Sequence, residues 1–256
     1  MKTILQINKY HYIRRGAERY YFNLSDLLQE KGHRVIHFSM QDPRNIPSEY
    51  AKYFVSNMDI AKPTFNLSGL QKALRIIYSR ESKKNIEALI RDTRPEIAHI
   101  HNIYHQLSPS ILSALKKNNI PVVMSLHDYK LISPNYTFLC REEICEHRHW
   151  YEEITHRSVK DSYVASAWCM LEKIIHDRWG IYKNAIDLFL APSAFIKNKF
   201  IEYGFDERKI KVLPYTLNLK DYSGNEKNNI QSDDYILYFG GLSKEKGIGV
   251  LLDAMA

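Results

Sequence analysis

The opening sixty residues alternate between short apolar runs and one amphipathic segment. Apolar residues dominate 2–8 (KTILQIN) and 34–40 (RVIHFSM), and runs of this length between polar residues are typical of buried strands. Between them, residues 17–32 place apolar side chains three or four positions apart, which predicts a helix that Gly32 ends. A strand, a helix and a second strand in this order are typical of a parallel sheet.

The same alternation continues along most of the chain. Further strands are expected at 96–102, 121–127, 186–192 and 210–215, with helices at 109–118, 158–180 and 194–203. This regularity predicts an α/β fold with a doubly wound parallel sheet. A polar stretch at 220–234 has the composition of a linker. An apolar run at 235–239, a glycine turn and a short apolar-periodic segment follow, and they predict one more strand and helix.

Composition adds limits on location and partners. The 256 residues, 45% of them hydrophobic, suit one large domain or two small ones. The chain has no run of the roughly 18 uncharged apolar residues that span a bilayer, and its first residues become polar too early for a signal peptide, so a cytosolic protein is expected. The three cysteines, Cys140, Cys145 and Cys169, are an odd number and are expected to be reduced.

A net charge of +7 permits attraction to phosphates, nucleic acid or an anionic membrane surface without choosing among them. The basic residues are dispersed and form no recognised nucleic-acid-binding motif, so no nucleic acid is expected as a partner. A predicted helix at 66–85 combines an apolar side with a basic one. The apolar side holds Leu67, Leu70, Leu74, Ile77 and Tyr78, and the basic side Lys72, Arg75, Arg80, Lys83 and Lys84. This pattern is typical of a helix on an anionic membrane and equally of a solvated surface helix.

Ligands of a doubly wound sheet bind at the carboxyl ends of the strands. Gly16 lies where the first helix begins, and free N–H groups there favour a phosphate or sugar that glycine lets approach closely. The loop is not GxGxxG, which disfavours a dinucleotide site, and a plain turn is an equal alternative. His127 and Asp128 end a predicted strand, where the ring can donate to a sugar hydroxyl and the carboxylate can orient it, unless both only cap a turn.

The neighbouring loops supply further candidates. His99 and His101 share one face of a strand, but no third metal ligand follows at a set spacing, so structural histidines are favoured over a metal site. His101 and Asn102 are still expected to face the cleft, together with Tyr129 and Ser193 from later loops.

One loop carries several metal-binding residue types. Residues 140–149 hold Cys140, Cys145, His147 and His149 at spacings that match zinc sites poorly. A polar loop over the cleft is therefore favoured, with zinc as the alternative.

Four segments in order, 14–35, 94–134, 188–205 and 236–254, resemble family 4 glycosyltransferases of the GT-B fold. The ordered set is specific, above all HIHN followed by PVVMSLHDY and closed by GGLSKEKG. The resemblance implies two Rossmann-like domains that face a cleft, the first holding mainly the acceptor and the second mainly the nucleotide-sugar. By this likeness 1–219 is the amino-terminal domain, and 235–256 is the first strand, turn and helix of the donor domain.

The resemblance also assigns roles. It places Gly16 and Ala17 near the donor phosphates, His127 on the transferred sugar with Asp128 beside it, and Lys246 on the diphosphate leaving group. Gly241 stands where the family usually has an arginine, so the partner of that lysine is absent.

The function implied is retaining, nucleotide-sugar-dependent hexosyl transfer to a glycan or lipid-linked acceptor, in the synthesis of bacterial surface polysaccharide or glycolipid. No cofactor and no metal are expected. A lipid-linked acceptor would bring the protein to the inner membrane face as a peripheral protein. The chain is expected to be inactive alone, because most of the donor domain would lie beyond residue 256. The alternative is a non-catalytic module that binds an acceptor or complements a separate donor-binding subunit.

Overall fold

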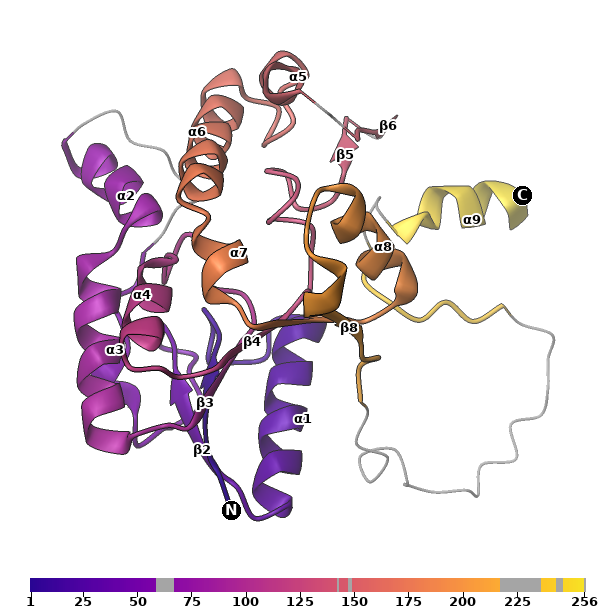
Figure 1. The fold of residues 1–256 in the computed structure, drawn as a ribbon. Helices are drawn as coiled ribbons and strands as arrows, with labels where there is room; N and C mark the ends of the chain where they lie inside the picture. The colour runs from indigo at the N-terminus through magenta and orange to yellow at the C-terminus, as the bar shows by residue number, and fades with distance from the viewer. Residues whose placement is uncertain (59–66, 142, 147–148, 217–235, 243–245, 256) are drawn as a thin grey trace, which may run out of the picture. The chain divides into compact units, whose positions relative to one another are not determined.

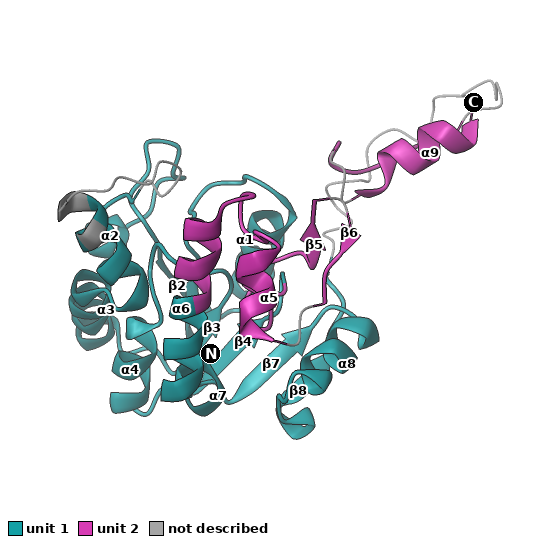
Figure 2. Ribbon diagram, turned by 90° about the horizontal axis from the view of Figure 1, so that it is seen from above, with its two compact units in different colours: residues 1–128, 171–217 teal, residues 129–170, 218–256 magenta. Residues whose placement is uncertain are grey.

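The computed structural model describes residues 1–58, 67–141, 143–146, 149–216, 236–242 and 246–255 (Figure 1). The chain divides into two compact units, Met1–Asp128 with Leu171–Leu217 and Tyr129–Met170 with Asn218–Ala256 (Figure 2).

A six-stranded parallel sheet with the order β2-β1-β3-β4-β7-β8 forms the centre of the first unit. Its strands are β1 (Thr3–Ile7), β2 (Arg34–Phe38), β3 (Ile97–Ile100), β4 (Val122–Ser125), β7 (Leu188–Ala191) and β8 (Ile210–Val212). Each predicted strand up to residue 215 is present, although shorter than expected, and the α/β Rossmann-like fold is confirmed. The apolar runs form strands because both faces of a parallel sheet are covered by helices.

Helices cover the two faces of this sheet. The helical segments are α1 (Gly16–Glu30), η1 (Ala51–Tyr53), α2 (Leu67–Ile77), α3 (Arg80–Thr93), α4 (Ser110–Lys117), α7 (Ile181–Ala185), α8 (Ala194–Glu202) and η2 (Glu207–Lys209). α1 lies on one side of the central strands, and α3 and α4 lie on the other (Figure 1). A longer helix, α6 (Tyr163–Trp179), starts in the second unit and ends in the first.

The strand order reverses direction at β1. The chain leaves β1 through α1 to β2 on one side, and then returns to β3 on the other side of β1. Such a reversal opens a crevice outside the carboxyl ends of the two central strands, which is where ligands of this architecture bind.

The predicted continuous helix at 66–85 is wrong, because α2 ends at Ile77 and α3 begins at Arg80. The break lies at Ser79, which is buried with an extended backbone. Its hydroxyl accepts a hydrogen bond from the backbone N–H of Ser82 at 3.0 Å and so caps α3. Apolar spacing alone did not reveal this cap.

The second unit contains a hairpin of β5 (Leu139–Cys140) and β6 (Glu143–Ile144), followed by α5 (Trp150–Thr155) and later α9 (Ile248–Met255). The three cysteines are buried free thiols, as expected. His147, one residue of the alternative zinc set, lies outside the described residues.

The helix predicted after the glycine turn is α9, but the strand predicted at 235–239 is not formed by the described residues Ile236–Phe239. Their apolar side chains are exposed, and no described strand pairs with them. A strand is stable only where a neighbour satisfies its backbone groups. The predicted linker at 220–234 lies outside the described residues.

In the part of the chain that the structure describes, every helix is too short or too polar to cross a membrane.

Candidate functional site

The loops after β1 and β3 are joined at the point where the strand order reverses. The N–H of Lys9 donates to the carbonyl of Asn102 at 2.7 Å, and the N–H of Asn102 donates to Oδ1 of Asn8 at 3.1 Å. Asn8 and Asn102 are both buried. The expected cleft residue Asn102 is therefore held rigidly at the carboxyl edge of the sheet.

Two histidines from neighbouring strands meet at this edge. Nδ1 of His101 lies 2.9 Å from Nε2 of His127, and the two rings stack with their centroids 5.1 Å apart. Nε2 of His101 lies 2.8 Å from Oε1 of Gln6 on β1, and Nδ1 of His127 lies 2.8 Å from the hydroxyl of Tyr215. The three contacts form one chain from Gln6 in the core to Tyr215, which is 43% exposed.

The contact with Gln6 decides which group donates in each of these three hydrogen bonds. A carbonyl oxygen only accepts, so Nε2 of His101 carries the hydrogen that it donates to Gln6. Nδ1 of a neutral His101 then accepts from Nε2–H of His127, which leaves Nδ1 of His127 as an acceptor for the hydroxyl of Tyr215. His127 thus presents an acceptor nitrogen toward Tyr215.

The rings are neutral because burial disfavours their charged forms. Desolvation lowers the pKa of His127 to about 3 and that of His99 to about 4, and it holds the pKa of His101 well below the ordinary value. His99 stacks on His101 at 4.5 Å, and its Nε2 lies 2.8 Å from the hydroxyl of Ser125. His99 is a satisfied structural histidine, as its spacing suggested.

Helix α1 brings its first turns to the same place. The ring of Tyr20 lies 5.7 Å from the ring of His127 and 4.7 Å from that of Tyr215. Four residues earlier, Gly16 is the first helical residue and is exposed, and a Cβ built on it meets no atom within 4 Å. Ala17 follows it in the first turn. The first turn of α1 is therefore exposed at Gly16, while the backbone N–H of Arg15 before it donates to the Glu18 carboxylate at 3.0 Å.

The remaining candidates of the first unit differ in how they are engaged. Asp128 lies beside the network, since burial, Tyr20 and the Asp128 carboxylate together raise the pKa of Tyr215. Ser193 caps α8, because its hydroxyl accepts from the N–H of Ile196 at 3.3 Å. That hydroxyl is therefore occupied by a structural contact.

Three predicted site residues lie in the second unit: Tyr129, Gly241 and Lys246. The ring of Tyr129 packs at 4.7 Å from that of Phe138, and the carbonyl of Gly241 accepts from the hydroxyl of Tyr238 at 2.9 Å.

A second histidine cluster, which the sequence did not indicate, packs against Tyr21 of α1. His11 and His37 approach with ring centroids 4.9 Å apart, and Nδ1 of His11 lies 3.0 Å from the hydroxyl of Tyr21. Burial lowers the pKa of His11 to about 4 and that of His37 to about 3. The ring of Tyr21 also lies 5.3 Å from that of His101. The two clusters are therefore continuous.

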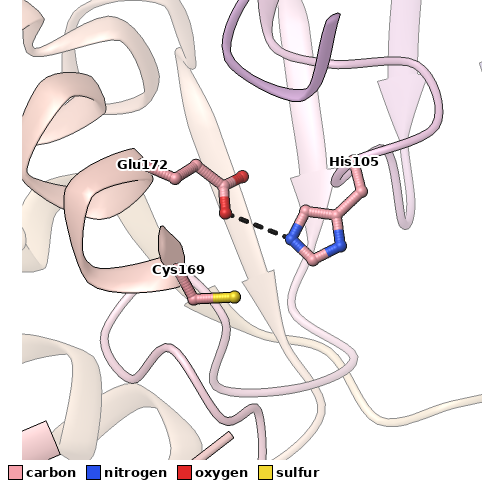
Figure 3. A group of neighbouring side chains, drawn as sticks. All are labelled: His105, Cys169 and Glu172. Carbon is pink, nitrogen blue, oxygen red and sulfur yellow. Dashed lines mark hydrogen bonds and ion pairs between the residues drawn. The ribbon is translucent and has the colours of Figure 1, made fainter. Parts of the chain in front are cut away.

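The loop after β3 is held by a buried hydrogen bond. Nε2 of His105 donates to Oε2 of Glu172 on α6 at 3.1 Å (Figure 3). Both side chains are almost inaccessible to solvent. The pair fixes the segment that leads from β3 to α4.

Among curated proteins, the chain is 28% identical over 261 residues to a Klebsiella pneumoniae protein described as an "Uncharacterized 42.6 kDa protein in cps region". The match covers 96% of this chain and 62% of that relative, so the chain spans less than two thirds of the relative's length.

Among solved structures, sucrose-phosphate synthase from Thermosynechococcus elongatus aligns with a TM-score of 0.52 and 13% identity, over 86% of this chain and 49% of that one. The Anabaena protein Alr3699/HepE, solved with UDP and glucose, aligns with a TM-score of 0.48 and 14% identity, over 87% and 46%. The model of the family described as "Glycosyltransferase Family 4" matches residues 14–220, from the loop before α1 to a point beyond β8. The chain therefore belongs to glycosyltransferase family 4.

Proposed function

We propose that this chain carries the acceptor side of a retaining, nucleotide-sugar-dependent glycosyltransferase that acts in surface polysaccharide or glycolipid synthesis. The observation that carries the proposal is the position of His127, which lies at the carboxyl edge of the sheet next to the first turns of α1, in a chain of this family. The Klebsiella relative encoded in a cps region supports the polysaccharide role.

In this proposal the sugar lies against His127 and the donor phosphates lie near Gly16. The open N-terminus of α1 suits an anion, since its N–H groups and helix dipole favour negative charge. A sugar hydroxyl then donates to Nδ1 of His127, which is the reverse of the direction expected from the sequence, because Nε2 is committed to His101. In the same proposal Asp128, which lies close enough to Tyr215 to raise its pKa, accepts from a second hydroxyl.

We further propose that transfer needs a donor-binding domain in addition to the described units. Turnover requires stabilisation of the charge that develops on the diphosphate. Lys246 is an exposed cation of the second unit, and Gly241 offers none where the family usually has arginine. The 256-residue chain alone is expected to show no measurable transfer, and rapid transfer by it would refute this part. The alternative function is a non-catalytic module that binds an acceptor or complements a separate donor-binding subunit. A module that only binds an acceptor predicts no activity even when a donor domain is supplied.

The substitution Gly16→Val tests the phosphate side of the proposal. Gly16 has no left-handed backbone and has open space at its Cβ position, so the variant is expected to fold with an unchanged melting temperature. Its side chain would keep a ligand away from the helix N–H groups, so nucleotide-sugar affinity should fall by about tenfold or more, the worth of one or two charge-assisted hydrogen bonds. Isothermal titration measures the affinity.

The matched control is Ala194→Val, which adds a similar bulk at the first residue of α8. Affinity should stay near that of the wild type, because Ser193 already caps that helix and no role is proposed for its N-terminus. Equal affinity of the wild type and Gly16→Val would refute a phosphate position at Gly16.

We also propose a peripheral association of α2 and α3 with an anionic membrane. Leu74 is 55% exposed, and Lys72 and Lys84 lie on these two helices. Arg75 is engaged by Ser56 and Glu81, so fewer cations are free for lipid than the sequence suggested. Flotation should recover more protein with anionic than with neutral liposomes, and Lys72→Glu with Lys84→Glu should remove the difference. Equal recovery of the wild type with both lipids would contradict the proposal.

A further inference from the structure

The hydroxyl of Tyr215 contacts Nδ1 of His127, the ring nitrogen that does not face His101. This hydroxyl lies 2.8 Å from Nδ1 of His127, and the two rings stack with centroids 5.4 Å apart at 27°. The other nitrogen of His127 faces His101, which has no exposed surface. Any ligand group that forms a hydrogen bond with this ring must therefore reach Nδ1, where Tyr215 already is.

We infer that Tyr215 is a positioning residue. Its hydroxyl occupies the position of a substrate hydroxyl at Nδ1 of His127 and is displaced when a sugar binds. This inference rests on the proposed function. The phenol suits such a stand-in, because it donates one O–H to an acceptor nitrogen as a sugar hydroxyl does. While no sugar is bound, the contact keeps the His127 ring oriented and its acceptor nitrogen satisfied.

The backbone around Tyr215 is built to let the side chain move. The last backbone bond of the sheet here is from the N–H of Leu213 to the carbonyl of Ala191 at 2.8 Å. Within the described residues, 214–216 form no backbone hydrogen bond and are exposed. Tyr215 is therefore held by its ring contacts with Tyr20 and His127 and by one hydrogen bond. Release breaks these contacts without opening the sheet.

The first measurement tests the contact itself and needs no ligand. In protein labelled with ¹⁵N-histidine, long-range ¹H–¹⁵N correlation spectra distinguish an acceptor nitrogen from a protonated one. His127 should carry its hydrogen on Nε2, and Tyr215→Phe should shift the Nδ1 signal of His127 while that of His99 stays in place. An unchanged His127 signal would overturn the inference, whether or not the chain binds sugar.

The second measurement tests the exchange of hydroxyl groups. The probes are UDP-glucose and UDP, because the ratio of their dissociation constants isolates the contribution of the sugar. Without the competing phenol, Tyr215→Phe should bind UDP-glucose about three- to tenfold more tightly relative to UDP, the worth of one hydrogen bond. His127→Ala should instead bind UDP-glucose more weakly relative to UDP.

A matched control removes a hydroxyl elsewhere. Tyr53→Phe deletes a hydroxyl that donates to Asp92 near the end of α3, at the opposite edge of the sheet, and should leave the ratio unchanged. If Tyr215→Phe weakens UDP-glucose binding as His127→Ala does, Tyr215 binds the sugar itself and the inference is wrong. If no variant binds either probe, the proposed function fails, and the spectra of His127 alone decide whether Tyr215 positions that ring.

Discussion

The first unit is expected to unfold as the pH falls from 7.5 to about 4.5. Five histidines there have a pKa that burial lowers: to about 4 for His11 and His99, to about 3 for His37 and His127, and well below the ordinary value for His101. In the unfolded chain these groups have pKa values near 6.5. Below about pH 6.5 the unfolded state therefore binds protons that the folded state does not.

This difference in proton binding sets the direction in which stability changes with pH. The stability that the neutral histidines contribute is fully present above about pH 6.5 and is lost as the pH falls toward their folded pKa values. Each histidine removes up to about 1.4 kcal/mol per pH unit, so over the two units between about pH 6.5 and 4.5 the five together remove up to about 14 kcal/mol. This is comparable with the roughly 5–15 kcal/mol that holds a typical domain folded. Urea unfolding followed by circular dichroism at pH 7.5, 6.0 and 5.0 should show a steep fall in the midpoint.

A variant at one histidine checks the origin of the effect. His99→Gln retains an amide that can reach the hydroxyl of Ser125, as Nε2 of His99 does, but does not titrate. Its pH slope should be smaller than that of the wild type by about one proton. A midpoint that is the same at pH 7.5 and pH 5.0 would contradict the buried neutral state of these rings.

Replacement of His101 by leucine is expected to lower the free energy of unfolding by about 2–6 kcal/mol at pH 7.5, since two buried polar groups lose their partners at about 1–3 kcal/mol each. The groups are Oε1 of Gln6 and Nε2–H of His127. The double variant Gln6→Leu with His101→Leu should recover part of this loss, because an apolar pair leaves fewer groups unpaired.

Denaturant unfolding of the four proteins in this cycle gives the coupling between the two residues. Additive losses in the double variant would show that Gln6 and His101 do not act as a pair. The same cycle followed by the ¹⁵N signals of His127 reports whether the ring loses its orientation.

The strands of the first unit were predictable because burial on both faces leaves continuous apolar runs in the sequence. β1, β2, β3, β4, β7 and β8 each fall within such a run. The break between α2 and α3 at Ser79 was not predictable, because the apolar spacing continues through it. Only the serine cap in the folded chain shows where α3 begins. The run at Ile236–Phe239 has the strand composition but no described strand to pair with.

The candidate site was predictable in its members but not in its connections. The rule that ligands lie at strand ends selected His101, Asn102 and His127, which do lie together. Tyr215 is 88 residues from His127 in sequence and belongs to no motif, so only the folded sheet brings the two together. The role of Gln6 was hidden for the same reason, because it lies 95 residues from His101 inside an apolar strand.

The central claim is that a nucleotide-sugar places its sugar against His127. Saturation-transfer difference spectra of a panel of nucleotide-sugars, recorded on the wild type and on His127→Ala, test it most directly, with His33→Ala at the opposite edge of the sheet as the control. At least one compound should show saturated sugar protons with the wild type and with His33→Ala, and His127→Ala should lose the sugar signal while the nucleotide signal remains. Sugar protons that are saturated equally in His127→Ala, or a panel in which no compound binds the wild type, would contradict the claim.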